Sequence, residues 1–486
     1  MIFNSISFIT FFIVVFFLYY FPLKENTKAQ NWLLLLSSYF FYGFADWKII
    51  PLLLMATIII FFLGIAVHKA GNSKKASLFT TLGVLTGLGL LVYFKYFNFF
   101  IDSFSSLLNA IGLNSNIGTF NIIMPLGISF FTFKLISYIV EIHRGKIEPA
   151  KDLVVFSTYI SFFPTILSGP IDKPNTFIPQ LQKKRSFDYN LVVDGFRQIL
   201  WGLFQKVVIA DNLAGVINGV WSDIPNQSGS VLFITAILYS FQLYTDFSGY
   251  SHMAIGVGKT LGFHIAKNFN YPYFSRNIAE FWRNWHMSLT SWLTDYIFMP
   301  LNIKFRNLGN LGITLAIVIN MVVVGMWHGA NWTFAIFGLY NGLLFIPLIL
   351  SGSFFKKKKL KTNKYGLPTI TDFSKMVGTF LLVTIGLIIF RAENISQFWQ
   401  YIGGLFDSSL FLFGSFGKSS ISSAILPIFF TLGLFTLEWI YKDSEYPLAR
   451  LGAKWKRPIR YAMYYTFIIV ILWLGGKGQQ FIYFQF

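Results

Sequence analysis

The sequence predicts an all-α, polytopic integral membrane protein with roughly eleven to thirteen transmembrane or re-entrant helices. Of its 486 residues, 55% are hydrophobic and 12% are charged, whereas an ordinary soluble domain carries about 25% charged residues. Apolar stretches of about 17 to 25 residues, each long enough to cross a bilayer, recur along the whole chain. They leave no room for a sizeable soluble domain, so we expect a single polytopic membrane domain over residues 1–486.

Loop charge orients the chain, because Lys and Arg are enriched in short cytoplasmic loops. The first four spans are expected near residues 2–20, 31–43, 49–67 and 78–96, the first as a retained span and not a removed signal peptide. Cations follow the first and third spans, which places the N-terminus outside, and a final span near 461–475 would also place the C-terminus outside. We therefore expect a multi-pass protein of the cell inner membrane. The cations of the basic loops are Lys24, Lys28, Lys69, Lys74, Lys75, Arg144, Lys146, Lys183, Lys184, Arg185, Lys356 to Lys359, Lys361, Lys364, Lys454, Lys456, Arg457 and Arg460.

The composition excludes several classes of function. The formal net charge of +19 could suggest a nucleic-acid partner, but the cations lie in short loops, where the positive-inside rule and anionic lipid explain them. The chain has no cysteine, which excludes disulfides, thiolate metal sites and a cysteine nucleophile. It also has no His-Glu-x-x-His motif, no Walker loop and no Gly-x-Ser-x-Gly elbow. We therefore expect no metal site and no nucleic acid.

Helices are expected to be interrupted in the middle of the chain. Residues 124–129 and 163–170 place Pro and Gly inside apolar runs. A broken helix is tolerated in a membrane only where protein or water satisfies the freed backbone groups. The centre is therefore expected to line a cavity, whereas the ends pack as plain helices, with C-terminal spans near 375–391 and 421–441.

His328 is a candidate general base. It follows the apolar run 313–324, and an ionisable residue in such a setting is a candidate functional site. At helical spacing Trp332 would share its face, while Gly325 and Gly329 would leave room for a thin substrate. A neutral imidazole could take a proton from an acceptor hydroxyl as the oxygen attacks a thioester or ester carbonyl. The alternative is a structural histidine hydrogen-bonded to a neighbouring helix.

His286 is the second candidate. On a continuous helix its neighbours at four residues would be Trp282 and Thr290, with Arg283 and Trp285 close by. It could polarise the carbonyl or orient the donor. Equally, the tryptophans could form an aromatic belt on an interfacial helix.

Asp246 lies in the polar segment 244–252, just after the apolar run 231–241. A carboxylate in a membrane costs about 2.5–3.5 kcal/mol on insertion scales unless it is paired. It could orient a catalytic histidine or the donor, or it could make a structural hydrogen bond between helices.

Several segments together resemble one known family. Residues 283–293 look like the Arg-x-Trp-His-x-Ser-Leu-x-x-Trp-Leu signature of the membrane-bound O-acyltransferases, or MBOAT family. Residues 326–332 are similar to that family's Trp-His-Gly motif. The remaining matches resemble the bacterial branch that includes the membrane subunit of alginate O-acetyltransferase, and they lie at residues 125–133, 169–171, 246–250 and 390–393.

The resemblance implies an all-helical fold with a central tunnel, which admits an acyl thioester from the cytoplasm and an acceptor from outside. It implies that His328 is the catalytic histidine and His286 the second active-site residue. Further support is expected from Asp246, Trp327, Arg283, Trp285 and Asn331. The bacterial branch acetylates extracytoplasmic polysaccharides, usually beside a separate periplasmic protein that completes the transfer.

We therefore expect an O-acetyltransferase that uses acetyl-CoA as donor substrate, binds no other cofactor and modifies a cell-envelope or exported polysaccharide. D-alanyl transfer from a carrier protein to teichoic acids is an alternative within the enzyme class. A transporter or flippase for a lipid-linked sugar and a non-catalytic scaffold are alternatives outside it.

One departure from the family concerns residues 141–145, Glu-Ile-His-Arg-Gly, where many relatives have an Asp-x-Tyr-Arg-Gly-like segment. We expect this segment to be a cytoplasmic loop.

Overall fold

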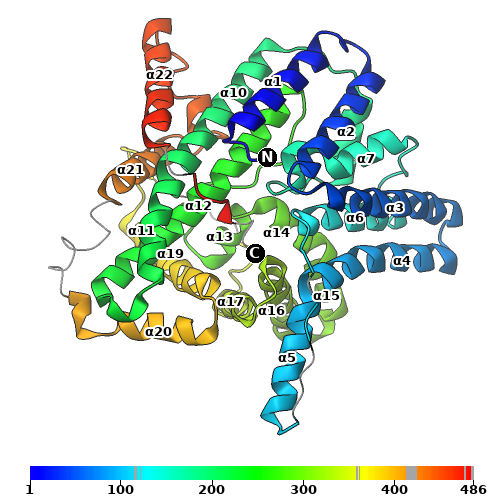
Figure 1. Cartoon of the computed structure of the whole chain (residues 1–486). Helices are drawn as coiled ribbons and strands as arrows, with labels where there is room; N and C mark the ends of the chain where they lie inside the picture. The colour runs from blue at the N-terminus through cyan, green and yellow to red at the C-terminus, as the bar shows by residue number, and fades with distance from the viewer. Residues whose placement is uncertain are drawn as a thin grey trace. The chain divides into compact units, whose positions relative to one another are not determined.

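The structure is a computed structural model that describes residues 1–113, 118–120, 122–356, 360, 362–411, 424–475 and 478–482 (Figure 1). The described residues form helices and no β-strand, which confirms the all-α prediction. Contacts divide the chain into two compact units, Met1–Phe196 with Ala254–Ala266 and Arg197–Met253 with Lys267–Phe486. This division does not test the single domain expected over residues 1–486, which stays a prediction.

The first unit contains the N-terminal helices and the interrupted segments. The predicted spans 2–20, 31–43, 49–67 and 78–96 are helices with somewhat different bounds. The helices of this unit are α1 (Ile6–Tyr20), α2 (Thr27–Gly43), η1 (Trp47–Ile49), α3 (Ile50–Ala70), α4 (Lys74–Leu91), η2 (Val92–Tyr96), α5 (Phe97–Ala110), α6 (Ile128–His143), α7 (Leu153–Ser161), α8 (Phe163–Ile166), α9 (Pro174–Gln182) and the first half of α10 (Tyr189–Leu203).

The second unit contains both candidate histidines. The predicted C-terminal spans correspond to α19, α21 and α22, although residues 421–423 lie outside the described residues. Its helices are η3 (Phe204–Ala210), α11 (Asp211–Trp221), η4 (Ile224–Asn226), α12 (Gly229–Thr260, whose end belongs to the first unit), η5 (Pro272–Phe274), α13 (Ile278–Asn284), α14 (Met287–Leu293), η6 (Thr294–Phe298), α15 (Met299–Lys304), η7 (Arg306–Leu308), α16 (Gly309–His328), α17 (Trp332–Leu343), α18 (Ile346–Leu350), α19 (Ile370–Arg391), α20 (Ile395–Leu405), η8 (Ser408–Phe411), α21 (Ile425–Ile440), η11 (Pro447–Ala449) and α22 (Arg457–Leu474).

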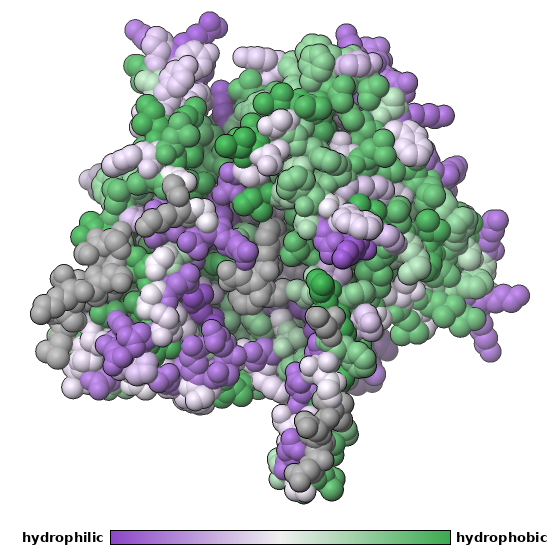
Figure 2. Space-filling model, in the orientation of Figure 1, coloured by the Kyte–Doolittle hydropathy of each residue, from purple (hydrophilic) through white to green (hydrophobic). Residues whose placement is uncertain are grey.

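Hydrophobic side chains remain exposed on many helices, as a membrane protein requires. Ile6 on α1 is 83% exposed and Leu472 on α22 is 77% exposed. Figure 2 shows hydrophobic side chains over much of the face in view. Seven helical stretches among the described residues are long and apolar enough to cross a membrane, and two shorter apolar helices, Ile6–Tyr20 and Ile425–Ile440, accompany them. The seven are Trp47–Ala70, Lys74–Ala110, Tyr189–Trp221, Gly229–Thr260, Arg306–His328, Trp332–Leu350 and Ile370–Arg391. The chain is therefore a multi-pass membrane protein, while the total of eleven to thirteen crossings and re-entrant segments stays a prediction.

The interrupted segments meet at Gly127. This residue adopts a φ of 75° just before α6, a left-handed conformation that glycine reaches at no steric cost. A Cβ atom here would collide with the carbonyl oxygen of Ile166, at the end of α8. The glycine therefore allows residues 124–129 to lie against 163–170, and the helix breaks expected at both segments are confirmed.

The segment 141–145 departs from its expected structure. Glu141 is a buried residue in the last turn of α6, and it pairs with Arg144 at 3.7 Å and Lys146 at 3.4 Å. Only the last two residues follow the helix, so the prediction of a loop over the whole segment was wrong. Of the basic loop near residue 360, Lys357, Lys358, Lys359 and Lys361 lie outside the described residues.

Glycines let α16 and α17 pack with their backbones in contact. A Cβ at Gly338 would collide with the carbonyl oxygen of Met321, and one at Gly325 would collide with the carbonyl oxygen of Phe334. Small residues of this kind are typical of membrane helix interfaces, where close approach provides the attraction. The hairpin fixes the position of His328, the last residue of α16.

We expect Gly338→Ala to destabilise the protein by about 1–3 kcal/mol, because the new methyl group overpacks the α16–α17 interface. Thermal unfolding of the purified protein in detergent would measure the effect. Gly378→Ala on α19 is the matched control, since a Cβ there meets no atom within 4 Å. Equal melting temperatures for the two variants would contradict the assigned role of the glycine contact.

Candidate active site

His328 lies in an aromatic pocket at the end of α16. Its side chain is buried, with the residue 5% exposed, and its ring lies 5.1 Å from Phe390 and 6.3 Å from Phe337 between centroids. Because the helix ends at His328, Trp332 does not share its face as predicted. Trp332 instead begins α17 and is 55% exposed.

His286 lies at a break between two short helices. It separates α13 from α14 and has a φ of 43°, in the left-handed region that costs a non-glycine residue about 1–3 kcal/mol. The expected positions of Trp282 and Thr290 on one continuous helical face are therefore wrong. The imidazole is only 1% exposed, so the surface-helix alternative does not describe this residue.

Asn268 holds the imidazole of His286. Its Oδ1 lies 2.9 Å from Nδ1 of His286 and accepts from the Ser288 hydroxyl at 2.8 Å, while its Nδ2 donates to the Ser251 hydroxyl at 3.0 Å. The Ser288 backbone N–H also points to Oδ1, at 3.4 Å, which identifies this atom as the acceptor. Nδ1 of His286 therefore carries the proton, and in the neutral ring the lone pair is on Nε2.

Trp327 brings the two histidines into one site. Its ring centroid lies 5.7 Å from that of His286 and 5.0 Å from that of His328. Phe247 on α12 closes another side of His286, edge to face at 4.6 Å. The structure thus gathers both predicted histidines and Trp327 within the second unit.

Arg283 lies between two cavities. Its guanidinium donates to the carbonyl oxygen of Phe354 at 2.6 Å. The residue lines a polar cavity of about 670 Å³ and also an apolar cavity of about 270 Å³. The apolar cavity is bounded by Trp282 of α13 and by Val324, one helical turn before His328. The continuous central tunnel stays a prediction.

The polar cavity contains both cations and carboxylates. Arg276 pairs with Glu280 at 3.1 Å and with Asp372 at 3.7 Å. Hydrogen bonds to Glu280 raise the pKa of Arg276 above its usual value, so it remains a cation. Lys356 and Lys375 add two more positive charges to the lining. An anionic ligand could pair with these groups.

Trp285 and Asn331, two of the expected support residues, make contacts away from the imidazoles. Trp285 packs in an aromatic cluster, 5.1 Å from Phe269 and 5.4 Å from Phe281 between ring centroids. Asn331 caps α17 through the Thr333 N–H at 3.1 Å and donates to the carbonyl oxygen of Glu393 at 2.7 Å. These contacts stabilise the surrounding helices, and the supporting role expected for each residue in the active site stays a prediction.

Asp246 belongs to an ionic cluster with Lys206 and Asp211. Its Oδ1 lies 2.7 Å from the Lys206 ammonium, and its Oδ2 accepts from the backbone N–H of Ile482 at 2.9 Å. Neither partner is a histidine. Any influence of Asp246 on the site is therefore transmitted through other residues.

Asn268 and Phe247 were not identified from the sequence. Asn268 precedes His286 by 18 residues and stands outside any helix. An asparagine in a loop carries no signal of its own, and the contact exists only after the segment folds back beside α14. Among the described residues there is also no group of three His, Asp or Glu side chains that could hold a metal ion.

Comparisons with known proteins identify the family. A profile of the membrane-bound O-acyltransferase family, MBOAT, matches residues 150–385. The chain is 35% identical over 434 residues to a Pseudomonas aeruginosa protein named "Probable alginate O-acetylase AlgI", covering 88% of this chain and 78% of that protein. It is 31% identical over 439 residues to the peptidoglycan O-acetyltransferase of Helicobacter pylori, covering 83% and 80% of the two chains. A third relative, the teichoic acid D-alanyltransferase of Bacillus subtilis, is 34% identical over 287 residues, which cover 56% of this chain and 70% of that protein.

The chain therefore belongs to the membrane-bound O-acyltransferase family. This confirms the resemblance drawn from residues 283–293 and 326–332. The polytopic helical fold agrees with it.

We expect Asn268→Ala to lower the turnover number for acyl transfer by about 10- to 100-fold, because the freed imidazole would lose its orientation. Asn268→Asp keeps the oxygen acceptor and should retain more activity than Asn268→Ala. Steady-state kinetics of the purified variants would measure both. Asn226→Ala, at an exposed asparagine bonded to Asp223, is the control. Wild-type turnover in Asn268→Ala would show that this hydrogen bond is dispensable.

Proposed function

We propose that the chain is a membrane O-acetyltransferase that moves acetyl from cytoplasmic acetyl-CoA across the membrane for O-acetylation of a cell-envelope or exported polysaccharide. The observation that carries the proposal is the pair of buried imidazoles that both pack on Trp327. Family membership and the names of two relatives, an alginate O-acetylase and a peptidoglycan O-acetyltransferase, support the acetyl group and the polysaccharide acceptor.

His328 acts as general base in this proposal. It removes the proton of the acceptor hydroxyl while that oxygen attacks the thioester carbonyl, and the thiolate of coenzyme A leaves and takes up a proton. General base catalysis of this kind contributes about 10²- to 10⁴-fold, and positioning adds more. Burial of the imidazole excludes bulk water, which would otherwise hydrolyse the thioester.

His286 has a different proposed role. Its neutral tautomer, set by Asn268, has no proton on Nε2. It therefore accepts a hydrogen bond, and we assign it to orienting the donor and not to polarising the carbonyl.

The donor would enter through the polar cavity. Its lining has four cations, Arg276, Arg283, Lys356 and Lys375, against the carboxylates of Glu280 and Asp372. This excess of positive charge suits the phosphates of coenzyme A, and the apolar cavity beyond Arg283 suits an acyl group. Lys356 belongs to a basic loop that the positive-inside rule assigns to the cytoplasm. The same rule supports an inner-membrane protein with both termini outside.

The acceptor is proposed to be a sugar hydroxyl or a serine of an extracytoplasmic partner protein that completes the transfer. D-alanyl transfer to teichoic acids is the second candidate, favoured by the Bacillus subtilis relative. That match covers only 56% of this chain, whereas the alginate-type match covers 88%. Family membership disfavours a transporter or a non-catalytic scaffold.

We expect His328→Ala to abolish O-acetylation of the envelope polysaccharide to the level of a deletion strain, because the general base is lost. Ester-linked acetate on purified polysaccharide would be measured at matched membrane levels of protein. His264→Ala, which alters an exposed histidine, is the control. Normal acetylation with His328→Ala would rule out the catalytic assignment, and loss of D-alanyl esters alone would favour the second candidate.

We expect Lys375→Gln to raise the KM for acetyl-CoA by about 3- to 10-fold with little change in kcat, because a phosphate-binding charge acts on ground state and transition state alike. Lys304→Gln removes an exposed lysine outside the cavity and serves as control. An unchanged KM would place the donor elsewhere.

A further inference from the structure

The chain turns back into the second unit after α22. Residues 478–482 follow this helix, and Phe481 and Ile482 are only 3% and 4% exposed. The ring of Phe481 stacks on that of Tyr250, on α12, at 4.7 Å. This terminal segment is therefore part of the packed interior.

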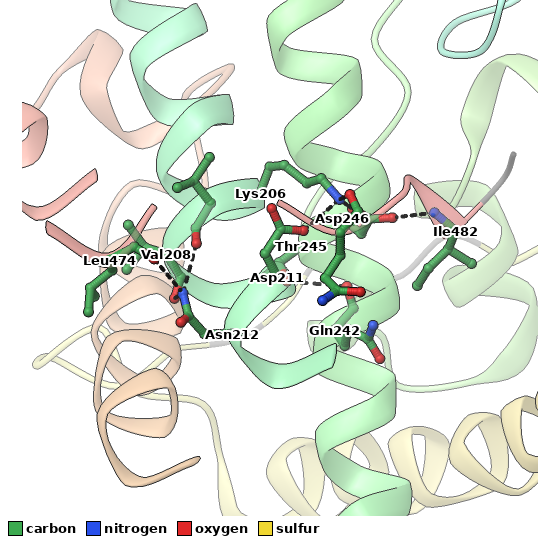
Figure 3. A network of polar contacts seen from close by, with 11 residues as sticks. Lys206, Val208, Asp211, Asn212, Gln242, Thr245, Asp246, Leu474 and Ile482 are labelled. Carbon is green, nitrogen blue, oxygen red and sulfur yellow. Dashed lines mark hydrogen bonds and ion pairs between the residues drawn. The ribbon is translucent and has the colours of Figure 1, made fainter. Parts of the chain in front are cut away.

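An ionic cluster lies beside the segment (Figure 3). Lys206 of η3 reaches Asp211 of α11 and Asp246 of α12, each at 2.7 Å. All three side chains are at most 6% exposed. One cation and two carboxylates leave a formal charge of −1 away from water, so further hydrogen-bond donors are needed to stabilise the carboxylates.

The terminal segment supplies such a donor and accepts one in return. The N–H of Ile482 donates to Oδ2 of Asp246 at 2.9 Å, and the Lys206 ammonium donates to the carbonyl oxygen of Gln479 at 3.2 Å. Lys206 thus forms ion pairs with Asp211 and Asp246 and a hydrogen bond with Gln479. The Lys206–Asp246 ion pair therefore binds the carbonyl group of Gln479 and the N–H of Ile482, three residues further on. Two such contacts fix the register of the segment.

Fixing the register places Phe481 against Phe247, which in turn packs on His286. The ring of Phe481 lies 5.9 Å from Phe247, and Phe247 lies 4.6 Å from His286. Phe247 also follows Asp246 directly in α12. Two consecutive residues of α12 therefore have linked roles: Asp246 binds the terminal segment, and Phe247 packs on the imidazole of His286.

We propose that the cluster of Lys206, Asp211 and Asp246 is a dock for residues 478–482, and that the docked Phe481 is a positioning residue that holds Phe247 against His286. Replacing a buried ion pair by apolar side chains is often neutral or stabilising, so stability alone does not explain such a cluster. The cluster is explained if it selects one register of the terminal segment. The proposal rests on the proposed function, because its consequence is correct acyl transfer.

The test removes the docking contact while keeping the cluster. Ile482→Pro lacks the N–H that Asp246 accepts, whereas Ile482→Val keeps both the N–H and most of the bulk. Phe481→Ala removes the aromatic ring, whereas Phe481→Tyr keeps one. The full-length variants would be purified in detergent and compared for kcat, KM for acetyl-CoA and melting temperature.

We expect Ile482→Pro and Phe481→Ala to lower kcat by about 10- to 100-fold, since a small displacement of a catalytic group has effects of this size. KM should stay near wild type. The melting temperature should fall in both damaging variants, because buried contacts are lost, so kcat is compared well below every melting temperature. Ile482→Val and Phe481→Tyr should retain turnover. Wild-type kcat in both damaging variants would overturn the proposal. So would a loss of kcat that appears only near the melting temperature of the variant, because that result describes general destabilisation.

A second readout does not depend on acyl transfer. Diethyl pyrocarbonate modifies histidine, and mass spectrometry can follow His286 and His328 separately in the same sample. Undocking should speed modification of His286 several-fold relative to His328. If wild type shows no acetyl transfer but this selective change occurs, the proposed function fails and the dock stands. Equal changes at both histidines, or none, would overturn the dock.

Discussion

The hydrogen bond between His286 and Asn268 is the contact on which the arrangement of the site depends. A buried imidazole is costly unless it is bonded, and this one also lies at a strained backbone position. The Ser288 hydroxyl and the Ser251 hydroxyl engage the same amide group, so its orientation is determined from two sides. Because the tautomer follows from that orientation, the chemistry open to Nε2 is set by the Asn268 amide at the other ring nitrogen.

The packing of α16 against α17 supplies the second half of the site. Backbone contact at Gly325 and Gly338 holds the end of α16, and with it Trp327 and His328, in one place. His286 comes from a helix break and His328 from a helix end. Both imidazoles thus occupy positions where the helical hydrogen-bond pattern stops, which lets their rings turn toward Trp327.

The sequence was sufficient to predict the fold class, because recurrent apolar stretches with few charges are long enough to cross a bilayer as helices. It also singled out His286 and His328, since polar residues among tryptophans and glycines are conspicuous. Their neighbours were harder to predict. Periodicity assumed a continuous helix through Thr290 and through Trp332, and both helices in fact end at or beside the histidine. The partners Asn268, Phe247 and Phe481 lie far from either histidine in sequence, so only the tertiary fold brings them together.

If the apolar cavity next to Arg283 holds the acyl group, as proposed, its walls bear on the size of that group. The cavity has a volume of about 270 Å³, and its lining includes Trp282, Ile317, Val324 and Phe345. The volume of such a cavity would limit the length of the acyl chain that fits in it. Shortening one of these side chains would enlarge the cavity, because the other walls stay in place. Chain-length selectivity in this protein would then depend on a few lining side chains, and single substitutions among them would alter it.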